Sequence, residues 1–225
     1  MKFMTPLSLV ATLVLLFLLP LLFGQIMAVS LVKLHLSPGW AVALITAIVV
    51  GSFINIPVKR IQRDEPVAAH PLAVIGVFNL WPELRSVRQE TVIAINVGGC
   101  LVPAGLALYE LAYLTALGGY ALFAAVIAAL VNITICYFLA RPTPGIGILI
   151  PGLVPALVAA MLALILLPEN AAPVAFVAGI AGPLIGADLL HLKEIKQIAV
   201  GMASIGGAGT FDGIVLSGII AAYLA

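Results

Sequence analysis

Seven long apolar stretches constrain this chain more than any other feature. They cover residues 6–28, 38–57, 91–114, 117–140, 146–168, 171–190 and 203–224. A helix needs about 20 apolar residues to cross the hydrocarbon core of a bilayer. Only 8% of the residues are charged, whereas about 25% is usual in a soluble domain. The sequence therefore predicts an all-α fold: a polytopic transmembrane helix bundle of about seven spans, forming a single integral membrane domain over residues 1–225.

The basic residues predict the orientation of these spans. If the N-terminus is cytoplasmic, nine of the ten Lys and Arg residues fall on the cytoplasmic side. The nine are Lys2, Lys59, Arg60, Arg63, Arg85, Arg88, Arg141, Lys193 and Lys196. Cytoplasmic loops carry an excess of Lys and Arg, so we expect a multi-pass protein of the cell membrane, inner or plasma. One long cytoplasmic loop, residues 58–90, then joins spans two and three.

The first apolar stretch has two interpretations. Lys2 and the apolar run from Leu7 to Phe23 resemble the start of a secretory signal peptide. The apolar core of a signal peptide is usually about 7–15 residues long. Because this run is longer, its length favours a retained helix over a cleaved signal.

Composition excludes several classes of partner. The formal net charge is +1, so the chain has no basic face for a nucleic acid. Cys100 and Cys136 lie in apolar stretches and are interpreted as small buried side chains rather than a disulfide. The three histidines form no cluster with the spacing of metal ligands. The sequence predicts no metal and no cofactor, and the lipid bilayer is the expected partner.

Two carboxylates, Asp188 and Asp212, are the candidate site. Asp188 lies where the sixth apolar stretch ends, and Asp212 lies inside the seventh. An ionisable side chain at bilayer depth is costly and marks a functional site by default. The loop between the two spans, residues 191–197, is short, so the spans are antiparallel neighbours. We expect both carboxylates in the cytoplasmic half of the membrane, as a catalytic or ion-binding pair.

Residues just before Asp212 are predicted to support this site. Gly206, Gly207, Gly209 and Thr210 precede the aspartate. Glycines allow close approach of two backbones or a locally unwound helix. Such a segment is tolerated at bilayer depth only where protein or water satisfies its backbone.

Other polar and proline residues inside the spans complete the candidate set. Pro151 and Pro155 are expected to break or kink span five, either for packing or as a discontinuous helix that lines a cavity. Asn96, Asn132 and Thr134 are expected to form hydrogen bonds between helices. Glu110 is expected to snorkel or to form a hydrogen bond at the outer interface.

Three stretches, 94–99, 186–190 and 205–213, resemble those of an uncharacterised prokaryotic family. It is a family of multi-spanning membrane proteins catalogued as domain of unknown function 1614. The likeness covers nearly the whole chain. It implies a membrane-embedded helical protein and brings no activity with it.

The aspartate pair also bears a distant and partial resemblance to the presenilin and signal-peptide-peptidase class of intramembrane aspartyl proteases. In that class the second aspartate follows a Gly-x-Gly motif, and a Pro-Ala-Leu motif after both aspartates completes the site. Here two further residues separate Gly207-Ala208-Gly209 from Asp212, and Pro155-Ala156-Leu157 precedes both aspartates. Ala187 stands before Asp188 where the class favours Tyr. The resemblance implies an acid/base role for the two aspartates alone.

Three hypotheses on function follow. The leading one is a small transporter or a proton or cation pathway that uses Asp188 and Asp212. The second is an intramembrane aspartyl protease in which the same pair activates a water. The third is a non-catalytic membrane scaffold with both carboxylates satisfied by hydrogen bonds. A transporter of this length favours a homo-oligomer, because seven helices enclose little volume. The sequence identifies no substrate.

Overall fold

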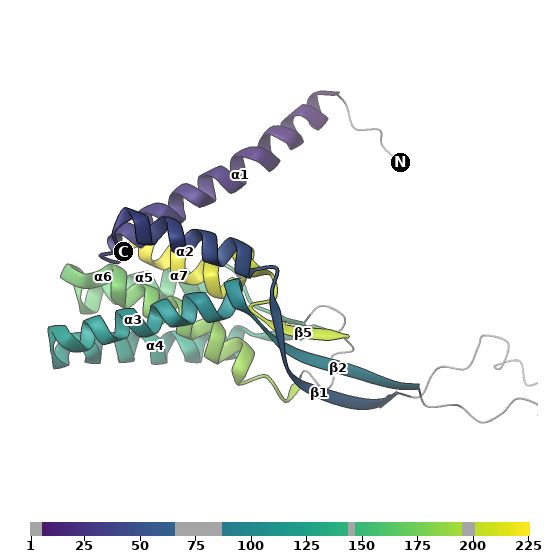
Figure 1. Ribbon diagram of the computed structural model, residues 1–225. Coiled ribbons are helices and arrows are strands. Elements are labelled where there is room, and N and C mark those ends of the chain that lie inside the picture. Colours follow the sequence, from purple (N-terminus) through teal and green to yellow (C-terminus); the bar gives the residue numbers. More distant parts are fainter. Residues whose placement is uncertain (1–5, 66–86, 144–146, 195–200) are drawn as a thin grey trace, which may run out of the picture.

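The computed structural model describes residues 6–65, 87–143, 147–194 and 201–225. Its described part is mostly helical (Figure 1), as predicted. The α-helices are α1 (Pro6–Lys33), α2 (Pro38–Gly51), α3 (Val102–Leu117), α4 (Gly119–Leu139), α5 (Val154–Leu166), α6 (Ala171–Ala181) and α7 (Gly213–Leu224). Two π-helical segments extend this set: η2 (Val97–Leu101) leads into α3, and η4 (Gly182–Leu189) continues α6.

Helix length and composition indicate a membrane protein. Three helical segments of the described residues, Val97–Leu117, Gly119–Leu139 and Pro168–Leu189, are long and apolar enough to cross a bilayer. Four further apolar helical segments are shorter than that: residues 18–33 of α1, and the helices over 38–51, 154–166 and 213–224. The coarse prediction of a helical membrane protein is thereby confirmed. The number of seven spans stays a prediction.

Small residues fill much of the contact between the helices of the bundle, and many large apolar side chains are exposed on its surface. Alanines fill the contacts among α4, α5, α6 and α7, where fourteen alanines of these helices are buried. Large apolar side chains point outward; Phe138 is 77% exposed and Ile165 is 71% exposed. Small residues let helix backbones approach closely inside a membrane, and an apolar surface of this extent fits lipid rather than water.

Strands correct the all-α prediction. β1 (Asn55–Glu65) and β2 (Val87–Asn96) pair antiparallel, and β5 (Met202–Ile205) pairs parallel to β2. The strand β2 occupies the first residues of the predicted span 91–114, because its β-branched run Val92-Ile93 and Ile95 suits a strand as well as a helix. In the predicted loop 58–90, the two ends are strands, and residues 66–86 lie outside the described part.

Three other predicted spans are also shorter as helices. In the predicted span 38–57, the helix α2 ends at Gly51 and the strand β1 begins at Asn55. In the predicted span 203–224, the helix α7 begins only at Gly213, after β5 and a 3₁₀ turn η6 (Gly209–Phe211). In the predicted span 146–168, the helix α5 begins at Val154, after a strand β4 (Gly147–Leu149) that pairs with β3 (Arg141–Thr143). Pro155 lies in the first turn of α5, where its missing N–H costs nothing. Span five, which the prolines were predicted to break or kink, is thus non-helical before Val154, and Pro155 belongs to the start of the helix rather than to a kink.

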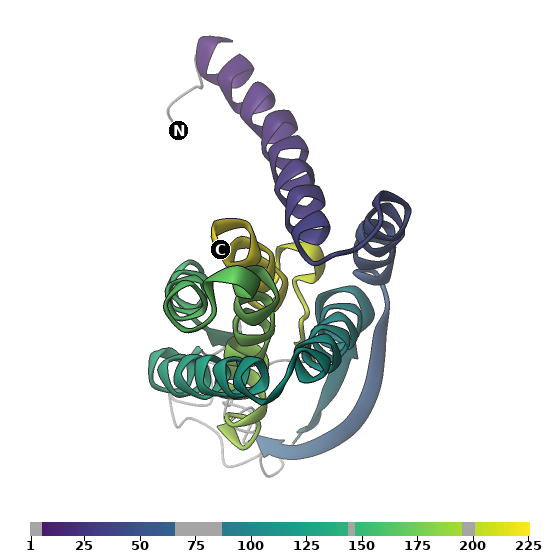
Figure 2. The same cartoon turned by 90° about the vertical axis from the view of Figure 1, so that its left-hand side faces the viewer.

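The helices α2 to α7 lie side by side with the strands β1, β2 and β5 at one end of the bundle (Figure 1), which we call the sheet end. Figure 2 shows α1 leaving the bundle toward its N-terminus. The C-terminal part of α1 is anchored: Met27 and Leu31 are buried, and Ser30 Oγ donates to Ile219 O in α7 at 2.9 Å.

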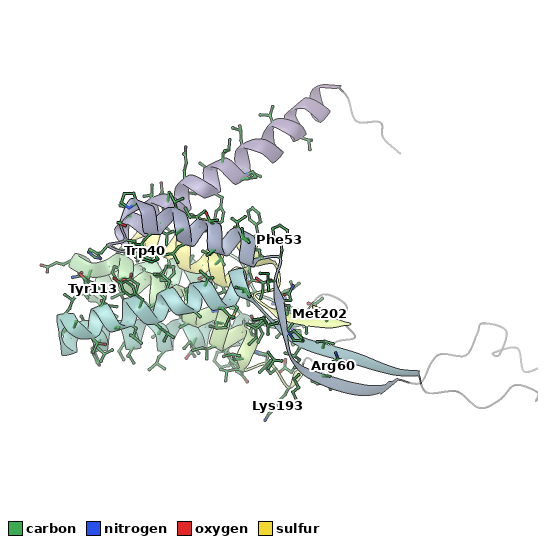
Figure 3. All side chains as sticks on the ribbon, viewed as in Figure 1. Trp40, Phe53, Arg60, Tyr113, Lys193 and Met202 are labelled. Atoms are coloured by element: carbon green, nitrogen blue, oxygen red, sulfur yellow. The ribbon has the colours of Figure 1, made fainter. Side chains whose placement is uncertain are left out.

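Figure 3 labels residues at both ends of the bundle, with Phe53 and Met202 at the sheet end. Arg60 and Lys193 lie at the sheet end, whereas Trp40 and Tyr113 lie at the opposite end, which we call the far end. Tyr113 Oη donates to Asn170 Oδ1 at 3.3 Å, so the η3 turn (Pro168–Asn170) between α5 and α6 is at the far end too. The basic residues Arg60 and Lys193 at the sheet end are what is expected if that end faces the cytoplasm.

Candidate functional site

A π-helical segment positions Asp188. After α6 the chain widens into η4, whose glycines press against α4: a Cβ at Gly182 would lie 2.5 Å from Asn132 Nδ2. At the end of η4, His191 Nδ1 lies 3.1 Å from Gly186 O and 2.9 Å from Ala187 O. Because both partners are acceptors, Nδ1 carries the proton. The imidazole thus closes the end of η4, and Asp188 is half-buried beside it.

Asp212 is the N-cap of α7. Its Oδ1 accepts from Ile214 N at 3.0 Å, and its Oδ2 accepts from Ala208 N at 3.2 Å. An N-cap carboxylate satisfies N–H groups that the first turn of a helix leaves without a partner, and it lies at the positive end of the helix dipole. Both oxygens of this carboxylate are therefore held by backbone donors.

Two glycines bring the segment before Asp212 against the start of α3. Parallel pairing aligns Ile95 of β2 with Ile205 of β5, so Gly99 and Gly206 meet just beyond the sheet. Gly206 has a φ of 71°, and a Cβ on it would lie 2.5 Å from the carbonyl carbon of Gly99. Any side chain at either position would overlap backbone, so this contact requires glycine.

A polar network fastens these segments to the end of α2. Asn96 Nδ2 donates to Ser52 O at 2.8 Å and to Asn55 Oδ1 at 3.1 Å. Ser204 Oγ also donates to Asn55 Oδ1, at 2.6 Å. Because the Ser52 hydroxyl donates to the carbonyl of residue 48, Thr210 Oγ1 is the donor in the 3.0 Å contact with Ser52 Oγ. The network joins α2, β1, β2, β5 and η6.

A cavity of about 620 Å³ contains both carboxylates. Its walls come from the irregular segments: β4 and its following loop, η4, β5 and the residues 206–213. Asn55, Asp188, Ser204 and Asp212 supply polar side chains. Of the described residues that line it, none is basic. The cavity thus brings two carboxylates to one place, and carboxylate oxygens are ligands that suit a hard cation.

The predicted site residues divide into three groups. Asp188, Asp212, Gly206 and Gly207 line the cavity. Gly209, Thr210 and Asn96 lie behind it in the glycine contact and the polar network. Three others do not line it: Pro151 borders a second, smaller pocket, Pro155 starts α5, and Asn132 joins α4 to α6.

Interhelical hydrogen bonds were predicted for three polar residues, and Asn132 forms one. Asn132 Nδ2 donates to Ala178 O of α6 at 2.8 Å, as predicted. Thr134 Oγ1 instead donates to Leu130 O of its own helix, so that prediction is wrong. Asn96 caps η2, accepting from Gly99 N at 2.7 Å, and joins it to α2 and β1.

Sequence reasoning missed four polar residues of this region. They are Ser52, Asn55, His191 and Ser204. Ser52 and Asn55 follow the second apolar stretch directly, and this polar pair beside a predicted span was an available signal. Nothing in the sequence marks Ser204, whose role depends on the parallel pairing of β5 with β2.

The described residues contain no group of three or more His, Cys, Asp or Glu side chains that could hold a metal ion. Within the same residues, Cys100 and Cys136 are buried and free, as the sequence predicts.

Comparison with known families identifies the chain. Residues 49–224 match the family described as "Protein of unknown function (DUF1614)". Because the match covers most of the chain, the chain belongs to this family, and the resemblance stated from the sequence is confirmed. No curated protein and no solved structure matches the chain.

Proposed function

We propose that this member of the DUF1614 family is a small transporter, or a proton or cation pathway, of the cell membrane, with Asp188 and Asp212 as its ion-binding residues. The observation that carries the proposal is the cavity of about 620 Å³ that both carboxylates line. The proposal includes seven spans, with the N-terminus and the sheet end on the cytoplasmic side.

The charge of the cavity supports a cationic ligand. Two carboxylates line it, and the described lining residues include no Lys, Arg or His to neutralise them. Counter-charge for a buried carboxylate is normally supplied by a basic side chain or a bound cation. The cavity has room for a bound cation.

The backbone geometry of the segments that line the cavity also supports a transport function. Secondary transporters bind ions where helices are broken, because unwound backbone at membrane depth offers carbonyl groups and is tolerated beside a water-filled cavity. Here η4 departs from α-helical geometry, and residues 206–212 form no α-helix. π-helical segments are frequent at functional sites.

The intramembrane protease is the second candidate, because the two carboxylates share one cavity. A proton-sharing pair needs one carboxyl free to activate a water. Asp212 instead has each oxygen held by a backbone N–H. That arrangement favours Asp212 as a fixed cation ligand over an acid/base role, so it favours a cation pathway over a proton pathway as well. A scaffold with no ligand would leave the cavity without a purpose, and we rank it third.

The test is ion flux in liposomes that contain the purified protein. Imposed gradients of H⁺, Na⁺ and K⁺ are followed with a pH-sensitive dye and ion-selective indicators. We expect flux of at least one of these ions in the wild type, and its loss in Asp188→Asn and Asp212→Asn. Glu169→Gln is the matched control, because Glu169 is an exposed carboxylate at the far end.

Two outcomes would overturn the proposal. Flux that is unchanged in both aspartate variants would remove these residues from the pathway. Absence of flux in the wild type, together with cleavage of a membrane-embedded peptide that depends on both aspartates, would favour the protease.

A further inference from the structure

Glu110 is the most deeply buried acidic side chain among the described residues. It lies in α3 with 0% of its surface exposed, and neither Oε1 nor Oε2 has a hydrogen-bond partner. The sequence had predicted a side chain that snorkels or forms a hydrogen bond at the outer interface, and that prediction is wrong. A charged group buried without a partner is among the costliest arrangements in a protein.

The position of Glu110 along α3 explains its burial. Leu106 and Leu114, one turn before and one turn after it, are both buried. Leu106 belongs to a cluster with Phe176 and Ile180, and Leu114 belongs to one with several α6 alanines. The face that carries Glu110 therefore packs into the bundle rather than toward lipid. The carboxyl lies about 10 Å along the axis from the far end of α3, at 1.5 Å per residue.

No counter-charge is available from the neighbouring helices. α3 packs on η2, α2, α4, α6 and α7, and none of these contains Asp, Glu, Lys, Arg or His. Their titratable side chains are Cys100 in η2, Tyr120, Cys136 and Tyr137 in α4, and Tyr223 in α7. A carboxylate that has no cation beside it in such a site takes up a proton and becomes neutral.

Two further polar groups lie in the helices around Glu110. On the far side, Tyr113 lies one turn further along α3, and its ring packs at 5.0 Å against the exposed ring of His35. Toward the sheet end, Ser217 Oγ in α7 is the other buried side-chain oxygen without a partner in the described structure. Ser217 follows Asp212 by five residues, or about 7.5 Å along the helix.

We propose that Glu110 is a proton-binding site in the interior of the bundle, which holds an exchangeable proton. One carboxylate oxygen accepts H⁺ to form a neutral carboxylic acid, and the same O–H bond breaks on release. This site is separate from the cavity. It gives the proposed pathway a proton-carrying residue nearer the far end, but proton binding by Glu110 does not require that Asp188 or Asp212 carries an ion.

The competing explanation is a buried acid that is protonated permanently and only fills space. Exchange of the carboxyl proton with water distinguishes these two explanations. A proton-carrying residue must meet water in some conformation of the native protein, whereas a space-filling acid keeps its proton until the protein unfolds.

Infrared difference spectroscopy on the full-length protein in liposomes tests the proposal. A protonated carboxylic acid has its own carbonyl stretch, distinct from that of a carboxylate. We expect this band in the wild type, its loss in Glu110→Gln and its retention in Glu169→Gln. We expect the band to shift when H₂O is replaced by D₂O under conditions in which the protein stays folded.

Two results would overturn the proposal. If Glu110→Gln retains the full band, Glu110 is not protonated. If the band fails to shift in D₂O, the acid does not exchange and fills space only. Both infrared results are obtained without a flux assay, so they do not depend on whether the transport proposal is correct.

A second measurement covers the case in which Glu110→Gln does not fold. An apolar carbodiimide adds to protonated carboxyl groups in apolar surroundings, and mass spectrometry locates the adduct. In the wild type we expect modification of Glu110 that declines as the pH is raised, with Glu169 unmodified by the same reagent. No adduct at Glu110 at any pH, or one that does not change with pH, would overturn the proposal.

Discussion

Asp212 combines two roles at the residue scale. Its carboxylate caps α7 through Ile214 N and holds the preceding turn through Ala208 N, while the same side chain faces the cavity. Asn is also a good N-cap residue, whereas Ala is a poor one. Two substitutions can therefore separate the charge of this side chain from its structural role.

We expect Asp212→Asn to keep the N-cap bond from Ile214 N, to lose the bond from Ala208 N, and so to be destabilised less than Asp212→Ala while it loses ion flux. Asp212→Ala should lose both flux and about 0.5–2 kcal/mol of stability, because the first turn of α7 then has unsatisfied N–H groups. Thermal unfolding of the purified variants in one detergent measures the difference. Equal melting temperatures for Ala and Asn would contradict the capping role.

The contact between Gly99 and Gly206 makes a second prediction at this scale. Gly99→Ala should prevent the native fold, because its Cβ would overlap Gly206 O. The matched control is Gly105→Ala in α3, where an added Cβ meets no atom within 4 Å. This substitution should stabilise the helix by up to about 1 kcal/mol, because glycine loses more backbone entropy on folding than alanine does.

Expression and monodisperse elution in detergent provide the measurement for this glycine pair. Folded Gly99→Ala protein with wild-type stability would mean that the junction of β2 and β5 can move apart.

Asn132 shows how a single polar side chain acts at the element scale. It reaches from α4 to the carbonyl of Ala178 in α6, at the level where α6 widens into η4. The same side chain fills the space left by the missing Cβ of Gly182. The hydrogen bond and the packing together hold α4 against the segment that carries Asp188.

We expect Asn132→Ala to destabilise the bundle by about 1 kcal/mol, the scale of an interhelical hydrogen bond in a membrane. Thr134→Ala is its control, since Thr134 bonds within its own helix and is not part of the α4–α6 contact. Reversible unfolding in mixed micelles gives both values. A loss for Thr134→Ala equal to that for Asn132→Ala would contradict an interhelical role.

At the scale of the whole molecule, the two ends of the bundle carry different exposed charges. Lys193 is exposed at the sheet end, and Glu169 is exposed in the η3 turn at the far end. The excess of basic residues on one side of a membrane predicts that the sheet end is cytoplasmic.

Labelling with a membrane-impermeant thiol reagent tests this orientation. In intact cells, Glu169→Cys should react and Lys193→Cys should not, whereas both should react in disrupted cells. The native Cys100 and Cys136 are buried, so the background is low. Reaction of Lys193→Cys alone in intact cells would reverse the orientation.

Hydropathy by itself determined that the chain is a helical membrane protein. Apolar runs of this length have few other solutions, because every backbone group in lipid needs an internal partner. Hydropathy also located Asp188 and Asp212, since a carboxylate inside an apolar run is conspicuous. It could not tell strand from helix in short apolar runs, so β2 and β5 were taken as parts of spans.

Only the tertiary structure decided that a cavity forms at the two aspartates and that Glu110 is buried. The cavity exists because β5 pairs parallel to β2 and brings residues 206–212 beside η4, and pairing between residues more than a hundred positions apart leaves no local pattern. The burial of Glu110 has the same origin. Its neighbours in sequence are typical of an outer interface, whereas the helices that cover it are placed by small residues whose packing partners hydropathy does not specify.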